Sequence, residues 1–349
     1  MSSFLKRFFD LKKNFIGVVS LSFILFVFFV SIFAYQIAPD NTSNANKMNL
    51  SIQSKKPGFE IDFLVKRNNS YRDFNFNNFL WGYEDLADEI PLSNYEIKDG
   101  IIHYLPYNSA EPDFKIISSE LAEIENKKFY FGTDKFGRDV LSRIIIGSRI
   151  SFYIGFISVL ISLFIGVIFG SISGYYSGTL DKIIMWIINV TWSIPTLLLV
   201  IAISLALGKG FWQVFIAVGL TMWVEVARVV RGQVKKYKEQ QFVISAKVLG
   251  FSDFRIIFYH ILPNIVSPLI VISAANFAAS ILIESGLSFL GLGAQPPMTS
   301  WGMMIKDNYN YIIIGDPFLA IIPGVCIMLL VCAFMLLGNS LRDILDVRS

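Results

Sequence analysis

The strongest constraint on the fold is a set of six apolar stretches, each about 20 residues long, the length an α-helix needs to cross the ~30 Å hydrocarbon core of a bilayer. The chain is 54% hydrophobic and only 16% charged, which is too apolar for a soluble domain of 349 residues. The sequence therefore predicts an all-α multi-pass membrane protein with six transmembrane helices. The stretches cover about 15–34, 150–172, 183–207, 211–229, 265–287 and 318–337.

The basic residues predict the orientation of these spans, because Lys and Arg are enriched in cytoplasmic loops. In the loop between the fourth and fifth spans, basic residues outnumber the acidic Glu239 and Asp253. We therefore expect this loop inside, together with a cytoplasmic N-terminal segment 1–14 and a cytoplasmic tail 339–349, and the short loops around Lys209 and Lys306 outside. The inner basic residues are Lys6, Arg7, Lys12, Lys13, Arg228, Arg231, Lys235, Lys236, Lys238, Lys247, Arg255, Arg342 and Arg348.

The first span has the basic start and apolar core that a signal peptide also shows. Its core is longer than that of a usual signal peptide, and no small-x-small cleavage site follows. We therefore expect 15–34 to be retained as a transmembrane helix.

The segment 35–147 is polar and is expected on the outer side as an insert and interfacial segment. The stretches FEIDFLV (59–65) and IIHYLP (101–106) favour strands, whereas NTSNANKMN (41–49) and FNFNNF (74–79) favour loops. Two interpretations stay open, a compact extracytoplasmic module with strands and an irregular spacer. The remaining five spans occupy 148–338.

The residues that usually carry catalysis or metal binding lack the necessary spacing. The two histidines, His103 and His260, form no metal motif, and Cys326 and Cys332 lie in an apolar run as packing residues. Charged residues are scarce within the spans, where Glu225 and Glu284 stand out, and ion-coupled carriers usually need more of them. Glu284 is interpreted as an interfacial carboxylate, with a lone ion ligand as the alternative. A transporter powered from outside the membrane domain fits this pattern.

Prolines and glycines within the spans predict bends and close packing. Each proline removes a backbone hydrogen bond and favours a kink. Glycines at i, i+4 and i+8 in GVIFGSISG provide one face for a neighbouring helix. The prolines are Pro195, Pro268 and Pro323, and the glycines are Gly166, Gly170 and Gly174.

The inner loop ISAKVLGFSDFRIIFYHILPN (244–264) predicts a helix, a tight turn and a second helix. Gly250 suits the left-handed residue that ends the first helix, and Ser252 suits the N-cap of a helix starting at Asp253. Pro263 stops this geometry or opens the next span. Phe251 is expected as an exposed aromatic that anchors into a groove on a partner, with docking on lipid as the alternative.

This loop resembles the coupling loop of ABC importer permeases, whose pattern is E-A-A, three residues, G, nine residues, I-x-L-P. The chain matches at Ala246, Gly250, Leu262 and Pro263 and differs at Ile244, Ser245 and His260. Four further stretches resemble the dipeptide/oligopeptide (peptide/nickel) branch of these binding-protein-dependent inner-membrane components. They are FGTDKFGRDVLSRIIIGSRIS (131–151), GYYSGTLD (174–181), ESGLSFLGLGAQPPMTSWGMM (284–304) and GNSLRDILDVR (338–348).

The resemblance implies a type I ABC importer permease fold in the bacterial inner membrane, forming half of a pathway for di- or oligopeptides. Implied partners are a homologous permease subunit, two cytoplasmic ATP-binding subunits and an extracytoplasmic peptide-binding protein; the partners hydrolyse ATP, and this chain binds no cofactor. The implied coupling loop is about 240–263, and the implied ATPase interface is Phe242, Ser245, Ala246, Gly250, Phe251, Ser252, Asp253, Leu262 and Pro263. The implied outer surface near the binding protein includes Gly132, Asp134, Gly137, Arg138, Asp139 and Trp301.

Two alternatives remain at this point. Relatives in the branch include nickel importers, so the same mechanism could carry nickel or another small solute. A multi-pass scaffold that organises partners without transport is an alternative of a different class. The insert 35–128 is longer than expected for the branch and is interpreted as an added docking surface.

Overall fold

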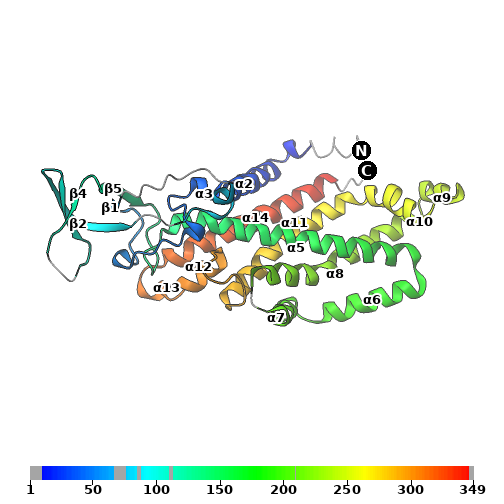
Figure 1. The fold of residues 1–349 in the computed structure, drawn as a ribbon. Coiled ribbons are helices and arrows are strands. Elements are labelled where there is room, and N and C mark those ends of the chain that lie inside the picture. Colours follow the sequence, from blue (N-terminus) through cyan, green and yellow to red (C-terminus); the bar gives the residue numbers. More distant parts are fainter. Residues whose placement is uncertain (1–9, 67–75, 85–87, 110–112, 209, 346–349) are drawn as a thin grey trace. The chain divides into compact units, whose positions relative to one another are not determined.

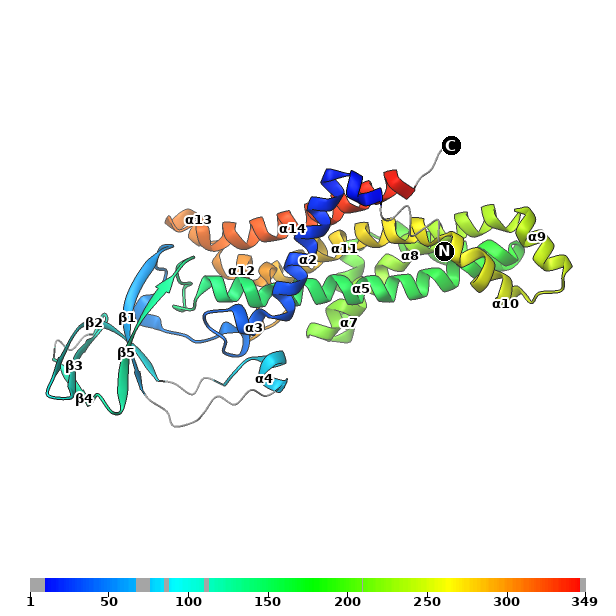
Figure 2. The same ribbon diagram turned by 90° about the horizontal axis from the view of Figure 1, so that it is seen from above.

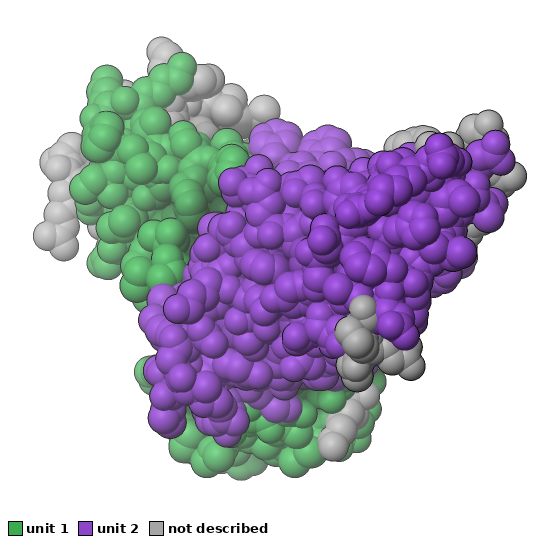
Figure 3. Space-filling model, turned by 90° about the vertical axis from the view of Figure 1, so that its left-hand side faces the viewer, with its two compact units in different colours: residues 1–28, 151–295, 325–349 green, residues 29–150, 296–324 purple. Residues whose placement is uncertain are grey.

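The computed structural model describes residues 10–66, 76–84, 88–109, 113–208 and 210–345. Two compact units make up the chain (Figure 3): one contains 1–28, 151–295 and 325–349, and the other contains 29–150 and 296–324. The terminal residues Lys6, Arg7 and Arg348, and Lys209 in an outer loop, lie outside the described residues.

Among the described residues, five helices are long and apolar enough to cross a membrane, and a bent helix pair provides a sixth candidate span. This confirms the predicted helical membrane architecture. Helix α5 begins at Val140, inside the predicted insert, and α14 continues through most of the predicted tail to Leu345. The helices are α2 (Phe15–Ile32), α5 (Val140–Tyr176), α6 (Gly178–Ser193) with α7 (Thr196–Leu207), α8 (Phe211–Lys238), α11 (Val266–Phe289) and α14 (Phe318–Leu345) (Figure 1).

The three prolines of the predicted spans affect the helix backbone in different ways. The third predicted span is two helices, α6 and α7, which meet at an angle of 95°. Ile194, directly before Pro195, is extended with φ −89° and ψ 129°, because the proline ring disfavours helical geometry in the preceding residue. The predicted loss of a hydrogen bond at Pro268 is wrong, since this residue lies in the first turn of α11, where an N–H has no intrahelical acceptor. Pro323 lies inside α14.

Aromatic rings join four helices of the first unit, and α5, α11 and α14 run alongside one another (Figures 1 and 2). The ring centroid of Phe152 on α5 lies 5.3 Å from that of Phe28 on α2 and 5.1 Å from that of Phe277 on α11. Phe277 stacks on Phe334 of α14 with centroids 3.9 Å apart. Gly155 provides the room for Phe277, since a Cβ there would lie 2.6 Å from its ring.

The predicted glycine face of α5 is confirmed, and its neighbour is α8. A Cβ on Gly166 would lie 2.5 Å from Cβ of Val226. On Gly170 and Gly174 it would lie 2.6 Å and 2.8 Å from the carbonyl oxygens of Ala227 and Arg231. The backbones of α5 and α8 therefore approach more closely than any larger residue permits.

The GYYSGTLD turn places a carboxylate between α5, α6 and α8. Ser177 and Gly178 have positive φ values of 57° and 64°, and the chain reverses there. In the first turn of α6, Asp181 accepts hydrogen bonds from Nε and Nη2 of Arg231 at 2.6 and 2.8 Å and from Nζ of Lys235 at 2.7 Å. The Ser173 hydroxyl donates to Asp181 at 2.5 Å. One side chain thus ties three helices together.

The insert is a folded module with a five-stranded antiparallel sheet in the order β4-β3-β2-β1-β5. The two strands predicted from FEIDFLV and IIHYLP are confirmed as β1 and β3. In the β1–β5 ladder, Phe59 pairs with Phe129. The strands are β1 (Phe59–Lys66), β2 (Glu89–Lys98), β3 (Ile101–Pro106), β4 (Lys115–Ser118) and β5 (Ala122–Phe129).

Both faces of this sheet bury apolar side chains, as alternation along a strand requires. Leu64 packs with Leu92 and Ile102 on one side, and Ile61 and Phe63 pack with Ile52 on the other. The interpretation as an irregular spacer is therefore wrong. The loop prediction for FNFNNF is also wrong for its last four residues, which begin a helix, while 74–75 lie outside the described residues. The shorter helices of this unit are α3 (Ala34–Ile37), α4 (Phe76–Trp81), α12 (Trp301–Asn308) and α13 (Tyr311–Ile314).

The glycine contact between α5 and α8 predicts that Gly170→Ala lowers the melting temperature of the purified protein in detergent. The added methyl group meets a carbonyl oxygen, and overpacking of this kind costs about 1–3 kcal/mol. Gly232→Ala on α8 is the matched control, because a Cβ there has no heavy atom within 4 Å. An unchanged melting temperature for Gly170→Ala would contradict the contact.

The three-helix carboxylate predicts that Asp181→Asn destabilises the N-terminal end of α6. The neutral amide loses charge-assisted hydrogen bonds worth roughly 1.5–3 kcal/mol. Hydrogen exchange measured by mass spectrometry should accelerate in the first turns of α6. The exposed neighbour Lys182→Gln should leave exchange unchanged, and equal exchange in both variants would refute the assignment.

Candidate functional site

The segment between α8 and α11 forms the predicted helix–turn–helix corner. Helix α9 (Gln241–Val248) ends at Gly250, whose φ is +79°. The Phe251 N–H donates to the Ala246 carbonyl at 3.1 Å and the Gly250 N–H to the Lys247 carbonyl at 3.0 Å, which is the Schellman arrangement. Helix α10 (Asp253–Arg255) follows and continues through a π-helical turn (Ile256–Ile261) and a 3₁₀ turn (Leu262–Asn264) into α11. Pro263 lies at the start of that last turn, so it opens the next helix.

A buried apolar cluster holds this corner against the end of α8. Val243 and Ala246 of α9 pack with Ile256 and Ile261, and all four are buried. Val230 and Val234 of α8 belong to the same cluster. Ala246 therefore supports the corner from within, while Phe242, Ser245, Gly250, Ser252 and Pro263 are exposed and Leu262 is half-buried.

The expectation of an exposed Phe251 is wrong. Its ring is half-buried and stacks on the His260 ring with centroids 5.7 Å apart and planes 11° apart. The Arg255 guanidinium also lies over the Phe251 ring, with its carbon 4.4 Å from the ring centroid. The most exposed apolar side chains of the corner are Val248 (82%), Leu249 (73%), Phe254 (66%) and Tyr259 (73%). We call these four residues the corner patch. The sequence alone predicts an exposed Phe251 because it does not show that the π-helical turn brings the His260 ring onto the Phe251 ring.

A chain of polar contacts connects the corner to α5. Ser252 occupies the N-cap position of α10, but the capping hydrogen bond expected from its side chain is not formed. Instead, Asp253 accepts a hydrogen bond of 2.7 Å from the Tyr175 hydroxyl at the end of α5. Lys238 of α8 donates to the Tyr175 carbonyl oxygen at 2.5 Å. These two contacts tie α10 and the end of α8 to the end of α5.

In the second unit, the loop 132–139 is organised by one buried carboxylate. Oδ1 of Asp134 accepts hydrogen bonds from the backbone N–H groups of Phe136 at 2.8 Å and Arg138 at 3.0 Å. Its Oδ2 accepts from Nε of Arg138 at 2.7 Å. Gly132 and Gly137 have φ near +70°, and a Cβ on either would lie within about 2 Å of a carbonyl oxygen of the segment 49–55. The loop is thus fixed tightly against that segment.

The predicted outer-surface residues are buried within the chain, so that prediction is wrong for their side chains. Asp134, Arg138 and Asp139 are almost inaccessible, and Trp301 is 3% exposed. Nε1 of Trp301 donates to the Ile144 carbonyl at 2.9 Å. A Cβ on Gly147 would lie 3.1 Å from the Trp301 ring, which shows how closely the two pack. These residues organise the start of α5.

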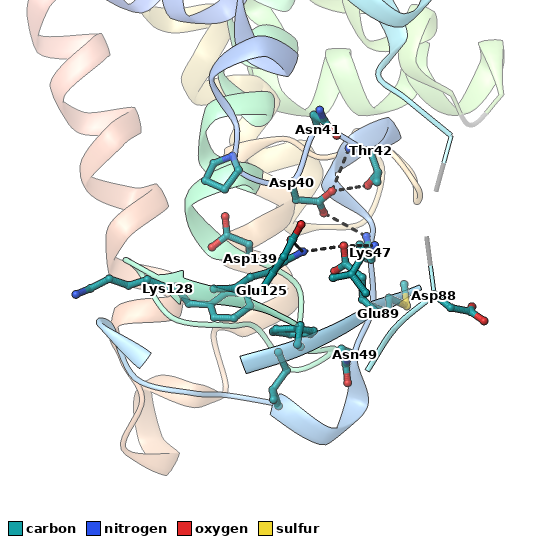
Figure 4. A pocket seen from close by; sticks show the side chains of 18 residues that line it. Asp40, Asn41, Thr42, Lys47, Asn49, Asp88, Glu89, Glu125, Lys128 and Asp139 are labelled. Atoms are coloured by element: carbon teal, nitrogen blue, oxygen red, sulfur yellow. Dashed lines mark hydrogen bonds and ion pairs between the residues drawn. The ribbon is translucent and has the colours of Figure 1, made fainter. Parts of the chain in front are cut away.

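A hollow of about 590 Å³ lies between the sheet and the segment 39–49 (Figure 4). Asp139 lines it and accepts a hydrogen bond from the Ser142 N–H at 2.9 Å, while burial raises the pKa of this carboxyl above its usual value. Burial also acts to raise the pKa of Glu89, but Lys127 at 2.7 Å and Lys47 at 2.9 Å outweigh it and lower that pKa. Glu89 is thus held by two lysines and Asp139 by a backbone N–H group, so both carboxyl groups are engaged within the second unit.

Comparison with known proteins agrees with this geometry. Residues 166–348 match the family described as "Binding-protein-dependent transport system inner membrane component". The chain is 41% identical over 244 residues to the glutathione transport system permease protein GsiD of Pectobacterium atrosepticum, covering 70% of this chain and 80% of the relative. Identity is 42% over 217 residues to the dipeptide transport system permease protein DppC of Bacillus subtilis, covering 62% of this chain and 68% of that protein.

Among solved structures, an inward-facing MetNI methionine ABC transporter chain matches with a TM-score of 0.46 and 17% identity, over 58% of this chain and 95% of that chain. The family match spans more than half of the sequence, and the insert precedes its first matched residue, Gly166. The chain therefore belongs to the family of binding-protein-dependent transport system inner membrane components, as a permease subunit of an ABC importer whose ATPase lies in partner subunits.

Proposed function

We propose that this chain forms half of the translocation pathway for di- or oligopeptides and that its inner corner docks on cytoplasmic ATP-binding subunits. The observation that carries the docking proposal is the corner patch. Four large apolar side chains project from an element whose other face is packed against α8. Such patches on water-exposed elements are typical of protein interfaces.

The charges around the corner support an inner location. The last turn of α8 carries Lys235, Lys236 and Lys238, and the corner itself contributes Lys247 and Arg255. Because cytoplasmic loops are enriched in basic residues, these charges support a cytoplasmic corner, and we propose that both termini lie on the same side. In this orientation the corner patch faces the cytoplasm, which is the compartment that contains ATP.

The polar connections suggest how force reaches the membrane. ATP-driven closure of the partner subunits would displace the corner, and the Asp253–Tyr175 hydrogen bond would pass this displacement to α5. The hydrogen bond from Ser173 of α5 to Asp181 would pass it on to α6. The bend between α6 and α7 is the place where a moved α6 could change access to the pathway.

The cargo proposal rests on two relatives whose names give glutathione and dipeptide as their substrates. Glutathione is itself peptide-like, so both point to short peptides. A homologous permease subunit, distinct or a second copy, would complete the pathway. An extracytoplasmic binding protein would deliver the peptide on the side of the insert 35–128, which we assign as an added docking module.

The docking proposal predicts that Val248→Asp abolishes co-purification of the ATP-binding subunits without unfolding the permease. A carboxylate in a desolvated apolar interface costs several kcal/mol, enough to reduce binding at least 100-fold. Ile116→Asp is the matched control, because Ile116 is an exposed apolar residue (66%) on β4 of the insert. Retained ATPase binding by Val248→Asp would refute the corner patch as the interface.

The cargo proposal is tested by uptake in cells that lack other peptide importers and express the complete transporter. Labelled dipeptide, glutathione and nickel ions are supplied separately. Accumulation of a peptide that disappears when this permease is deleted is expected. Accumulation of nickel without either peptide would refute the peptide assignment and favour the metal-importing alternative.

A further inference from the structure

Glu225 is a carboxylate within a membrane span. It lies on α8 inside the apolar stretch 211–229, and its side chain is exposed on the surface of the chain. The stretch ends four residues after Glu225 (229 − 225). At 1.5 Å per residue this is about 6 Å, so Glu225 lies toward one end of the span. Charged side chains within a span almost always face protein or a water-filled cavity, and we infer the same for Glu225.

Glu225 lines a small hollow. A cavity of about 150 Å³ lies at the break between α6 and α7 and includes Glu225 in its lining. Most of the other lining side chains are apolar, and the hydroxyls of Thr191 and Thr221 donate to carbonyl groups of their own helices. The exposed carboxylate at a break in a span therefore favours a water-accessible pathway at this place.

Arg228 lies about one helical turn after Glu225 on α8, and side chains of α6 hold its guanidinium in place. Nη2 of Arg228 donates to Asn189 at 2.8 Å, and its guanidinium carbon lies 3.4 Å from the centroid of the Trp192 ring. Its Nε is buried and without a hydrogen-bond partner among the described residues. Within that part of the chain, no ion pair joins Arg228 to Glu225, so the two opposite charges do not neutralise each other by direct contact.

We propose that Glu225 and Arg228 form a subsite for the charged ends of a peptide in transit. The Glu225 carboxylate receives the terminal ammonium group, and the Arg228 guanidinium receives the terminal carboxylate. Residues at i and i+3 have Cβ atoms about 5–6 Å apart, and the termini of an extended dipeptide are about 7 Å apart. The subsite rests on the proposed peptide cargo and adds the chemical group that each residue recognises.

Glu225→Gln tests the subsite in the complete transporter, reconstituted in liposomes with its peptide-loaded binding protein. The amide keeps the shape but loses the charge, so dipeptide import should fall about tenfold or more. Complex yield and ATP hydrolysis without peptide should stay at wild-type levels, and the ATP consumed per imported peptide should rise. A residue with a merely structural role would lower yield and hydrolysis together. Glu225→Asp should recover part of the import, and Glu120→Gln, in the exposed turn after β4, should import normally.

The outcomes separate this subsite from the proposed function. Wild-type import rates in Glu225→Gln would overturn the subsite and leave the peptide cargo intact. Failure of Glu225→Gln to assemble would show that Glu225 pairs with a cation of a partner subunit, which also overturns it. If the wild-type transporter imports no peptide, the proposed cargo is wrong and the subsite is refuted with it.

Discussion

The close approach of α5 and α8 is the interaction on which the rest of the helical unit depends. Gly166, Gly170 and Gly174 allow backbone contact along the C-terminal half of α5. This contact sets the position of Tyr175 and of the turn that carries Asp181. Tyr175 is hydrogen-bonded to Asp253 of the corner, and Asp181 is hydrogen-bonded to Arg231 of α8. A shift of α5 would therefore misplace the corner as well. Small side chains thus determine where the large and charged ones act.

Much of the architecture could be predicted, because it follows from periodicities that are local in the sequence. The apolar stretches gave the spans, two alternating stretches gave β1 and β3, and Gly250 gave the corner its turn. The tertiary contacts could not be predicted in this way. Phe251 is covered by His260, and Asp134 and Arg138 neutralise each other in a buried loop. Charge and aromaticity alone suggested surface for all of these residues, whereas their partners in space decide their burial.

The family pattern at the corner acquires a different meaning from the structure. Ala246 and Gly250, which match the pattern, serve the packing and the turn of the corner. The departure at Ile244 lies on the exposed side of α9. The positions where this chain matches the family pattern are thus positions that shape the backbone and the packing of the corner. In the docking that we propose, the apolar residues that project outward would contact the partner, and these positions lie outside the family pattern.

The break at Pro195 has a consequence for assembly. Helix α7 has 12 residues, and at 1.5 Å per residue it reaches about 18 Å, too short to cross the bilayer alone. The hydroxyls of Thr191 and Ser193 satisfy carbonyl groups of Ile187 and Val190 in the last turns of α6. Beyond them, broken backbone at membrane depth is tolerated only where protein or water covers it. A solitary copy in lipid would therefore leave backbone groups at this break uncovered, and the proposed second permease subunit would supply the protein surface that covers them.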